Sequence, residues 1–223
     1  METGLQKGAD RLESKDFSAR TPGIIGEEKF RKYAVLIPMI DVSGVTCLLF
    51  EKRSGKLRHQ PGEICFPGGK LESGESLKEC AVRETAEELL VLPQQIGVIG
   101  PGDIYISPFN LMIHPFIGVI RDYRDTFSQD EVEEIIKIPL DFFRSRQPEK
   151  FESRLINEPD AGFPYEWIPG GVKYPWAEGT YDILFYQYEN RTIWGMTAQM
   201  VKSAVGLIDA YHINPETDIF KER

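Results

Sequence analysis

One segment, residues 68–88, constrains the fold of this chain more than any other. It opens with a Gly-Gly pair and closes with a run of acidic residues at helical spacing. Ser76 and Glu79 match a capping box, in which two side chains bind backbone N–H groups at the start of a helix. The sequence therefore predicts a helix from Ser76 to about Leu90 that ends before Pro93.

Three glutamates of this helix, Glu84, Glu87 and Glu88, stand at positions i, i+3 and i+4, which places them on one face. Clustered carboxylates repel one another, by roughly a few tenths of a kcal/mol per close pair in water and by more when partly buried. Arg83 can pair with Glu87, but one guanidinium does not neutralise three acids. A hard divalent cation with oxygen ligands, Mg²⁺ or Mn²⁺, would supply the missing charge. The helix alone leaves a second interpretation open, a solvated acidic face.

The Gly-Gly pair before the helix favours the cation, because glycines let the backbone approach a ligand closely. The whole segment resembles the Nudix box, G-x5-E-x7-R-E-U-x-E-E-x-G-U, in which U is aliphatic. Six fixed positions agree in register, and they are Gly69, Glu75, Arg83, Glu84, Glu87 and Glu88. Thr85 and Leu90 depart from the pattern. We expect Leu90 to change the end of the helix, because it replaces the glycine that favours a left-handed cap.

The resemblance implies an α/β protein with the Nudix fold, an α/β/α sandwich around a mixed β-sheet. It also implies hydrolysis of a nucleoside diphosphate linked to another moiety, with Glu84, Glu87 and Glu88 as ligands of Mg²⁺ or Mn²⁺. Catalytic roles would fall to Glu84, to Arg83 as the residue that orients the glutamates, and to Glu75 as an auxiliary ligand. The general base stays open between these glutamates and acids further along the chain. The later candidates are Glu131, Glu133 and Glu134.

Residues 48–69, just upstream, resemble the signature of coenzyme A pyrophosphatases within this family, L-L-T-x-R-S-x3-R-x3-G-x3-F-P-G-G. Phe50 and Glu51 depart from it, whereas residues 130–134 and 194–198 look like that subfamily. The resemblance implies cleavage of coenzyme A, or of an acyl or oxidised form, to 4′-phosphopantetheine and adenosine 3′,5′-bisphosphate. It also implies a set of substrate-binding residues, namely Arg53, Arg58, Phe66, Gly68 and Gly69.

The local charge agrees with this substrate. Lys52, Arg53, Lys56 and Arg58 form a basic cluster that suits the extra 3′-phosphate of coenzyme A, with a solvated loop as the plain alternative. Two rival functions remain open. One is a Nudix pyrophosphatase for ADP-ribose or another dinucleotide, to which Pro108 lends slight support. The other is a nucleotide-sensing module without turnover.

The composition excludes several other classes of function. With 35 acidic and 26 basic residues the net charge is −9, which argues against duplex nucleic acid as a partner. Three His and no HExxH argue against a zinc hydrolase, and no apolar run is long enough to cross a membrane. No apolar segment typical of a signal peptide stands at the start. We expect a small nucleotide substrate, no membrane partner and a cytoplasmic location. The oligomeric state stays open, with a homodimer as one alternative.

We expect an N-terminal extension over residues 1–30 with one short helix, a hydrolase domain over 31–213, and a C-terminal tail over 214–223. Proline-rich residues 145–179 predict a long loop or irregular hairpin. Its aromatic residues, Trp167, Tyr174 and Trp176, either line a ligand pocket or pack together, and Trp194 is interpreted as core. Apolar runs predict five strands, namely Tyr33–Ile40, Val45–Phe50, Ile113–Ile120, Glu134–Ile138 and Tyr181–Tyr188. Gln60–Lys70 is predicted to be loop, Pro139 to start a short helix, and Thr197 to cap the last helix.

Overall fold

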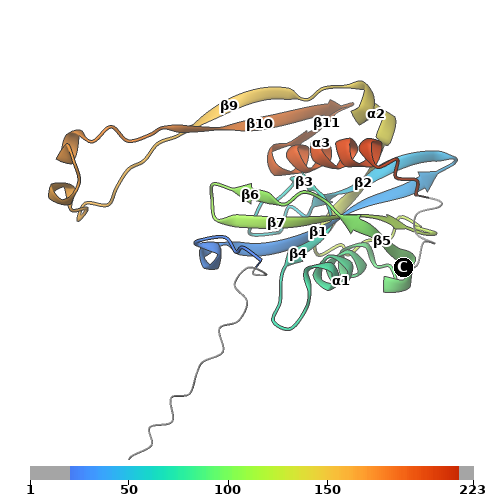
Figure 1. Cartoon of the computed structure of the whole chain (residues 1–223). Helices are drawn as coiled ribbons and strands as arrows, with labels where there is room; N and C mark the ends of the chain where they lie inside the picture. Colours follow the sequence, from blue (N-terminus) through green and yellow to red (C-terminus); the bar gives the residue numbers. More distant parts are fainter. Residues whose placement is uncertain (1–20, 216–223) are drawn as a thin grey trace, which may run out of the picture.

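The computed structural model describes residues 21–215, and these form three layers (Figure 1). A mixed β-sheet lies between two helices, α1 (Leu77–Leu89) on one face and α3 (Gly195–Ala210) on the other. The predicted α/β/α sandwich is therefore confirmed. Within the described residues the sheet has eight strands, which are β1 (Arg31–Val42), β2 (Val45–Arg53), β3 (Ile64–Cys65), β4 (Gly68–Lys70), β5 (Ile96–Pro101), β6 (Tyr105–Ser107), β7 (Leu111–Ile120) and β8 (Val132–Pro139).

The middle of the sheet contains a gap that the Gly-Gly segment fills. Strands β1 and β2 pair antiparallel only near their shared turn, from Met39 opposite Leu48 to Val42 opposite Val45. Beyond that point β3 pairs with β2 and β4 pairs with β1, where Gly68 stands opposite Val35. On its other edge β1 runs parallel to β7, and β2 runs antiparallel to β8. The segment that leads into α1 is thus held between the two central strands.

The alternation of side chains along β2 assigns each residue to one face of the sheet. Leu49 belongs to the core beneath α1, together with Leu89. Phe50 belongs to the larger core under α3, where it stacks on Phe66 with ring centroids 4.7 Å apart. Glu51 therefore faces the side of α1, and the next residue, Lys52, faces the side of α3.

The N-terminal end of α1 confirms the predicted capping box. Ser76 Oγ accepts the N–H of Glu79 at 3.3 Å, and Glu79 Oε2 accepts the N–H of Ser76 at 2.7 Å. At the other end the helix stops at Leu89, as predicted, but the expectation that Leu90 would remove the left-handed cap was wrong. Leu90 adopts the left-handed conformation usual for glycine, with φ 51° and ψ 45°, and the Thr126 hydroxyl donates a hydrogen bond to the Leu89 carbonyl at 2.7 Å. The left-handed cap therefore forms at Leu90 although a leucine side chain disfavours it, and the hydrogen bond from Thr126 lies directly beside it.

The C-terminal part forms a second sheet from β9 (Glu149–Leu155), β10 (Gly179–Tyr188) and β11 (Arg191–Trp194), after the short helix α2 (Leu140–Ser145). Strands β9 and β10 make a hairpin that projects away from the sandwich, with the 3-10 turns η4 (Tyr165–Trp167) and η5 (Gly171–Lys173) at its tip (Figure 1). Residues 145–179 are therefore more regular than predicted. Strand β9 was missed because its sequence, EKFESRL, is mostly exposed and carries only two apolar residues, Phe151 and Leu155.

Other differences concern short elements. Thr197 does not cap α3, because the helix already begins at Gly195 after Trp194 and buries Thr197 in its first turn. Strands β3 and β4 lie within the predicted loop 60–70, since a two- or three-residue strand has no periodicity of its own. The N-terminal extension contains the 3-10 turn η2 (Glu27–Lys29), and its first 20 residues lie outside the described part of the chain, as does most of the tail. The domain boundaries stay a prediction.

Candidate active site

Gly68 and Gly69 bring the backbone of β4 against the acidic helix. A Cβ atom on Gly68 would overlap the β1 backbone at Ala34 and Val35, and one on Gly69 would overlap the carboxylate of Glu84. Gly68 therefore requires glycine for steric reasons, whereas a side chain at position 69 would displace the Glu84 carboxylate. This close approach places the backbone of β4 beside the glutamates of α1, so that an anionic ligand could contact both.

The three box glutamates do not share one environment. Glu88 is buried, and its Oε2 accepts the N–H of Gly68 at 2.8 Å. Burial, together with the neighbouring Glu51, raises the pKa of Glu88 to about 9. Burial also raises the pKa of Glu84, whose carboxylate lies against Gly69. Glu87 is 59% exposed on the outer flank. The face predicted to carry all three thus divides into the buried Glu88, the partly buried Glu84 and the exposed Glu87.

Arg83 holds the outer part of the cluster. Its guanidinium binds Glu75 through two hydrogen bonds, Nε to Oε2 at 3.0 Å and Nη2 to Oε1 at 2.8 Å. Its Nη1 also donates to Glu84 at 2.9 Å and to Glu87 at 3.3 Å. Hydrogen bonding to Arg83 holds the pKa of Glu75 at about 2. This geometry supports the orienting role expected of Arg83, and it leaves Glu75 committed to the guanidinium.

Glu51 is a carboxylate of this region that sequence reasoning missed. It is 0% exposed on β2, its Oε1 accepts a hydrogen bond from Cys65 Sγ at 3.4 Å, and its Oε2 has no partner among the described residues. Burial raises its pKa to about 7. The available signal was an acidic residue inside a run of buried strand positions, at a place where the coenzyme A signature carries Thr.

The later acids also separate. Glu133 pairs with Lys52 at 2.7 Å, and Glu134 pairs with Arg191. Glu131 is exposed, and its negative charge contributes to the raised pKa values of Glu51, Glu84 and Glu88. Of the three candidates for a late general base, Glu131 is therefore the one whose charge acts on the cluster.

The donor set fits a hard divalent cation, because the α1 side chains that reach Gly68 and Gly69, Glu88 and Glu84, offer carboxylate oxygens. The unpartnered oxygen of Glu51 points to the same conclusion. Within residues 21–215, however, no three Asp, Glu, His or Cys side chains already lie close enough together to hold an ion. Arg83 binds both Glu84 and Glu87, so a cation would compete with the guanidinium for them.

The predicted substrate-binding residues have different surroundings. Arg53 lies on the α1 side of β2, donates to the carbonyl of His59 at 3.4 Å, and acts electrostatically on Glu51. Arg58 is exposed on the following loop. Phe66 is a correction: it is 2% exposed and stacked on Phe50, so its ring shapes the loop from the core and offers no surface to a substrate. The basic cluster divides as well, since Lys52 faces the opposite side of the sheet.

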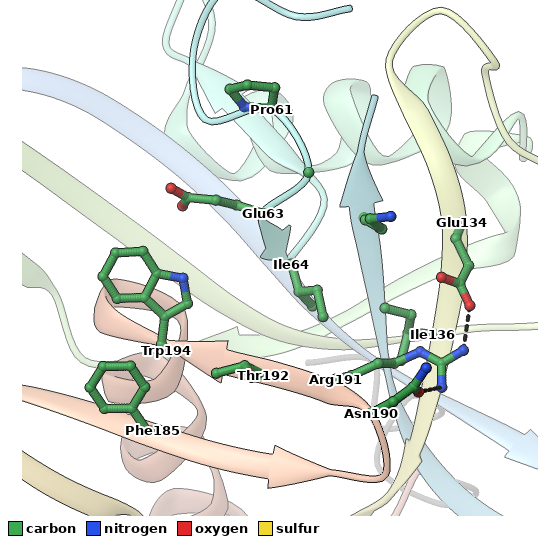
Figure 2. Close-up of a pocket in the computed structure, with 12 residues that line it drawn as sticks. Pro61, Glu63, Ile64, Glu134, Ile136, Phe185, Asn190, Arg191, Thr192 and Trp194 are labelled. Atoms are coloured by element: carbon green, nitrogen blue, oxygen red, sulfur yellow. Dashed lines mark hydrogen bonds and ion pairs between the residues drawn. The ribbon is translucent and has the colours of Figure 1, made fainter. Parts of the chain in front are cut away.

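A cleft of about 560 Å³ lies on that opposite side, between the sheet and the hairpin of β10 and β11 (Figure 2). Phe185 and Trp194 stack along one wall with centroids 5.9 Å apart, and Trp194 is 43% exposed rather than core. Lys52 and Arg191 supply cations to the lining. Trp167, Tyr174 and Trp176 do not line it. Tyr174 and Trp176 pack together at the hairpin tip, 5.0 Å apart.

A glycine-paired acidic helix on an α/β/α sandwich defines the class, a hydrolase of phosphoric anhydrides. The chain belongs to the Nudix family, because the model of the NUDIX domain matches residues 30–158, more than half of its length. Nudix hydrolases act on small nucleotide-derived substrates and use divalent metal ions. The match agrees with the box read from residues 69–88.

Individual relatives agree with the family. The chain is 30% identical to Nudix hydrolase 3 of Caenorhabditis elegans over 79% of this chain and 72% of the relative. It is 31% identical to the peroxisomal coenzyme A diphosphatase NUDT7 of Mus musculus over 59% of this chain, and it spans only 56% of that protein's length. The crystal structure of a MutT/nudix family protein from Enterococcus faecalis shares the fold, with 12% identity, a TM-score of 0.51, and coverage of 92% of this chain and 71% of that one.

Among the described residues, no helix has both the length and the apolar character needed to span a membrane. The cytoplasmic location stays a prediction, and the mouse relative is by its name a peroxisomal protein. The oligomeric state likewise stays open.

Proposed function

We propose that this Nudix hydrolase cleaves the diphosphate of coenzyme A, or of an acyl or oxidised derivative, to 4′-phosphopantetheine and adenosine 3′,5′-bisphosphate. One observation carries the choice of substrate. Arg53 stands on the same face of β2 as the acidic cluster, at the strand end where the loop with Arg58 begins. A second phosphate can therefore meet cations while the diphosphate lies against Gly68 and Gly69. The relative named as a coenzyme A diphosphatase supports the same choice.

In the proposed mechanism, Glu84 and Glu88 hold Mg²⁺ or Mn²⁺, with Glu87 available once it leaves Arg83. When bound, the cation neutralises charge on the diphosphate and on the leaving phosphate. The chain's own part is positioning: the glycines admit the diphosphate to the backbone, and Arg83 orients Glu84. Glu131, exposed beside the cluster, takes the proton of the attacking water.

The cleft shown in Figure 2 is where we place the part of the substrate beyond the diphosphate. Ile64 lines the cleft, and Gly68 is four residues further along the same chain, at most roughly 13 Å in extended form. The exposed face of Trp194 offers a stacking surface for an aromatic base, and Lys52 offers a cation.

A substrate panel tests the proposal. Purified protein with Mg²⁺ is given coenzyme A, dephospho-coenzyme A, ADP-ribose and NADH, and product release is measured for each. We expect coenzyme A to have the highest kcat/KM. A faster reaction on ADP-ribose would transfer the assignment to the dinucleotide class, and no release from any of the four would favour a sensing module.

A single substitution sharpens the panel. Arg58→Ala should lower kcat/KM on coenzyme A roughly ten- to a hundredfold, the value of one charge-assisted phosphate contact. If that contact is to the 3′-phosphate, the loss on dephospho-coenzyme A is much smaller. Arg154→Ala is the matched control, because that arginine is exposed on the hairpin and pairs with Glu178. Equal losses on both substrates would assign Arg58 to the diphosphate or to the loop instead.

A further inference from the structure

We propose that Glu51 is a fourth carboxylate of the divalent-cation site, supplied by strand β2 from beneath the acidic helix. This inference rests on the proposed function, because it adds a residue to the same metal centre. It concerns a position outside the Nudix box, where this chain also departs from the coenzyme A signature.

The first support is the unsatisfied chemistry of the side chain. Glu51 is completely buried, one of its oxygens accepts only a weak bond from a thiol, and the other has no partner in the described part of the chain. A buried carboxylate without compensation is among the most destabilising groups that a core can hold. Such a group destabilises the fold unless a bound ion or another partner compensates its charge.

The second support is the direction in which the carboxylate lies. The groups that act on it come from several elements, and they are Glu88 from α1, Glu131 before β8, Cys65 from β3, Tyr123 after β7 and Arg53 on its own strand. Two of these are acids, and the one cation, Arg53, is already bonded to the carbonyl of His59. The buried side of the cluster therefore has an excess of carboxylate oxygens, which is what a hard cation requires.

The third support is the local backbone. The register between β2 and β8 shifts between Lys52 and Arg53, directly after Glu51. Such irregularities re-aim side chains and are frequent beside functional sites. Glu51 also stands where β3 joins β2, opposite Cys65, three residues before Gly68. The irregular strand end, the glycine segment and the inward face of α1 thus converge on one place.

Calorimetric titration of Mn²⁺ into the metal-free protein tests the inference. Glu51→Gln keeps the shape of the side chain and removes its charge, and we expect Mn²⁺ affinity to fall roughly 10- to 100-fold. Without Mn²⁺ the melting temperature should hold or rise, because a buried charge has gone. Glu152→Gln is the matched control with the same charge change on exposed β9, and it should bind Mn²⁺ like the wild type.

Wild-type Mn²⁺ affinity in Glu51→Gln, with binding lost in Glu88→Gln, would overturn the inference. No Mn²⁺ binding by the wild type would overturn it too. If Glu51→Gln fails to fold, Glu51→Thr carries the test, because the signature has Thr at this strand position. The proposed function can fail separately. If the wild type binds Mn²⁺ through Glu51 but does not release products from coenzyme A, the metal site stands and only the substrate assignment is wrong.

Discussion

The outer and inner halves of the carboxylate cluster differ in how their charge is balanced. On the outside, Glu75, Glu84 and Glu87 all contact Arg83, with nitrogen to oxygen distances of 2.8 to 3.3 Å. On the inside, Glu51 and Glu88 are buried, and the charge of Glu51 raises the pKa of Glu88. The difference shows that Arg83 balances the charge of one set of acids within the protein, whereas the buried pair is where the proposed metal ion would supply the balancing charge.

The strongest way to break this comparison is to remove a charge from the inner half. Glu88→Gln should lower kcat at least 100-fold at saturating Mg²⁺, because the proposed ligand loses its charge while the N–H of Gly68 keeps an oxygen acceptor. The melting temperature without metal should hold or rise, and the upward shift caused by millimolar Mg²⁺ should shrink. Steady-state kinetics and thermal melts measure both. Near-normal turnover would show that the inner half is a structural acid pair.

The pH dependence of stability sharpens the same comparison, because the two halves have opposite signs. The pKa of Glu88 is about 9 in the folded protein, so its favourable contribution is full below about 4.5 and is lost as pH rises through 9. The pKa of Glu75 is about 2, so its contribution is present above about 4.5 and is lost as pH falls through 2.

Denaturant unfolding of the metal-free protein at a series of pH values should therefore show a loss of stability at both the acid and the alkaline end of the range. Between pH 5 and 9 the free energy of unfolding should fall steadily, because the folded protein holds a proton on Glu88 that the unfolded chain releases. Added Mg²⁺ should flatten this alkaline limb and leave the acid limb unchanged. A profile that stays flat to pH 9 without metal would mean that the inner carboxylates reach water.

The smallest expected effect comes from the C-terminal end of α1, the helix that carries Glu84, Glu87 and Glu88. Leu90→Gly should raise the free energy of unfolding by roughly 0.5–1 kcal/mol, because Leu90 occupies a left-handed conformation and is 59% exposed. Turnover should not change, since neither half of the cluster moves. Leu89→Gly, one residue earlier and fully buried, should instead destabilise the protein. Destabilisation by Leu90→Gly would show that contacts of the leucine outweigh its backbone strain.

Local signals in the sequence predicted the parts of the fold that depend on local physics. The capping box of Ser76 and Glu79 and the hairpin of β1 and β2 were found because each is specified by neighbouring residues. The cap at Leu90 was mispredicted because a contact from Thr126, far along the chain, is absent from any local pattern. Strand β9 was missed because an exposed hairpin needs no hydrophobic alternation.

The candidate site divides in the same way. Spacing on the helix identified the box glutamates and Arg83, but it could not tell that Glu87 faces outward and Glu88 inward, which depends on where β4 lies. Phe66 was misassigned because a ring in a glycine-rich loop looks exposed until its stacking on Phe50 is known. Glu51 could be assigned to the candidate site only from the three-dimensional structure. Its sequence position in a strand does not reveal that it lies close to Glu88.

The order of strands in the sheet has a kinetic consequence. The helix and the glycines lie within residues 68–89, but β2 is closed on its outer edge by β8, whose residues 132–139 come much later in the chain. Pairing across so many residues makes a slow step, because a long loop must close before the contacts form. During synthesis the carboxylates are therefore present and hydrated long before the sheet encloses them. Burial of Glu51 therefore depends on a pairing with β8 that cannot form until residues 132–139 are available.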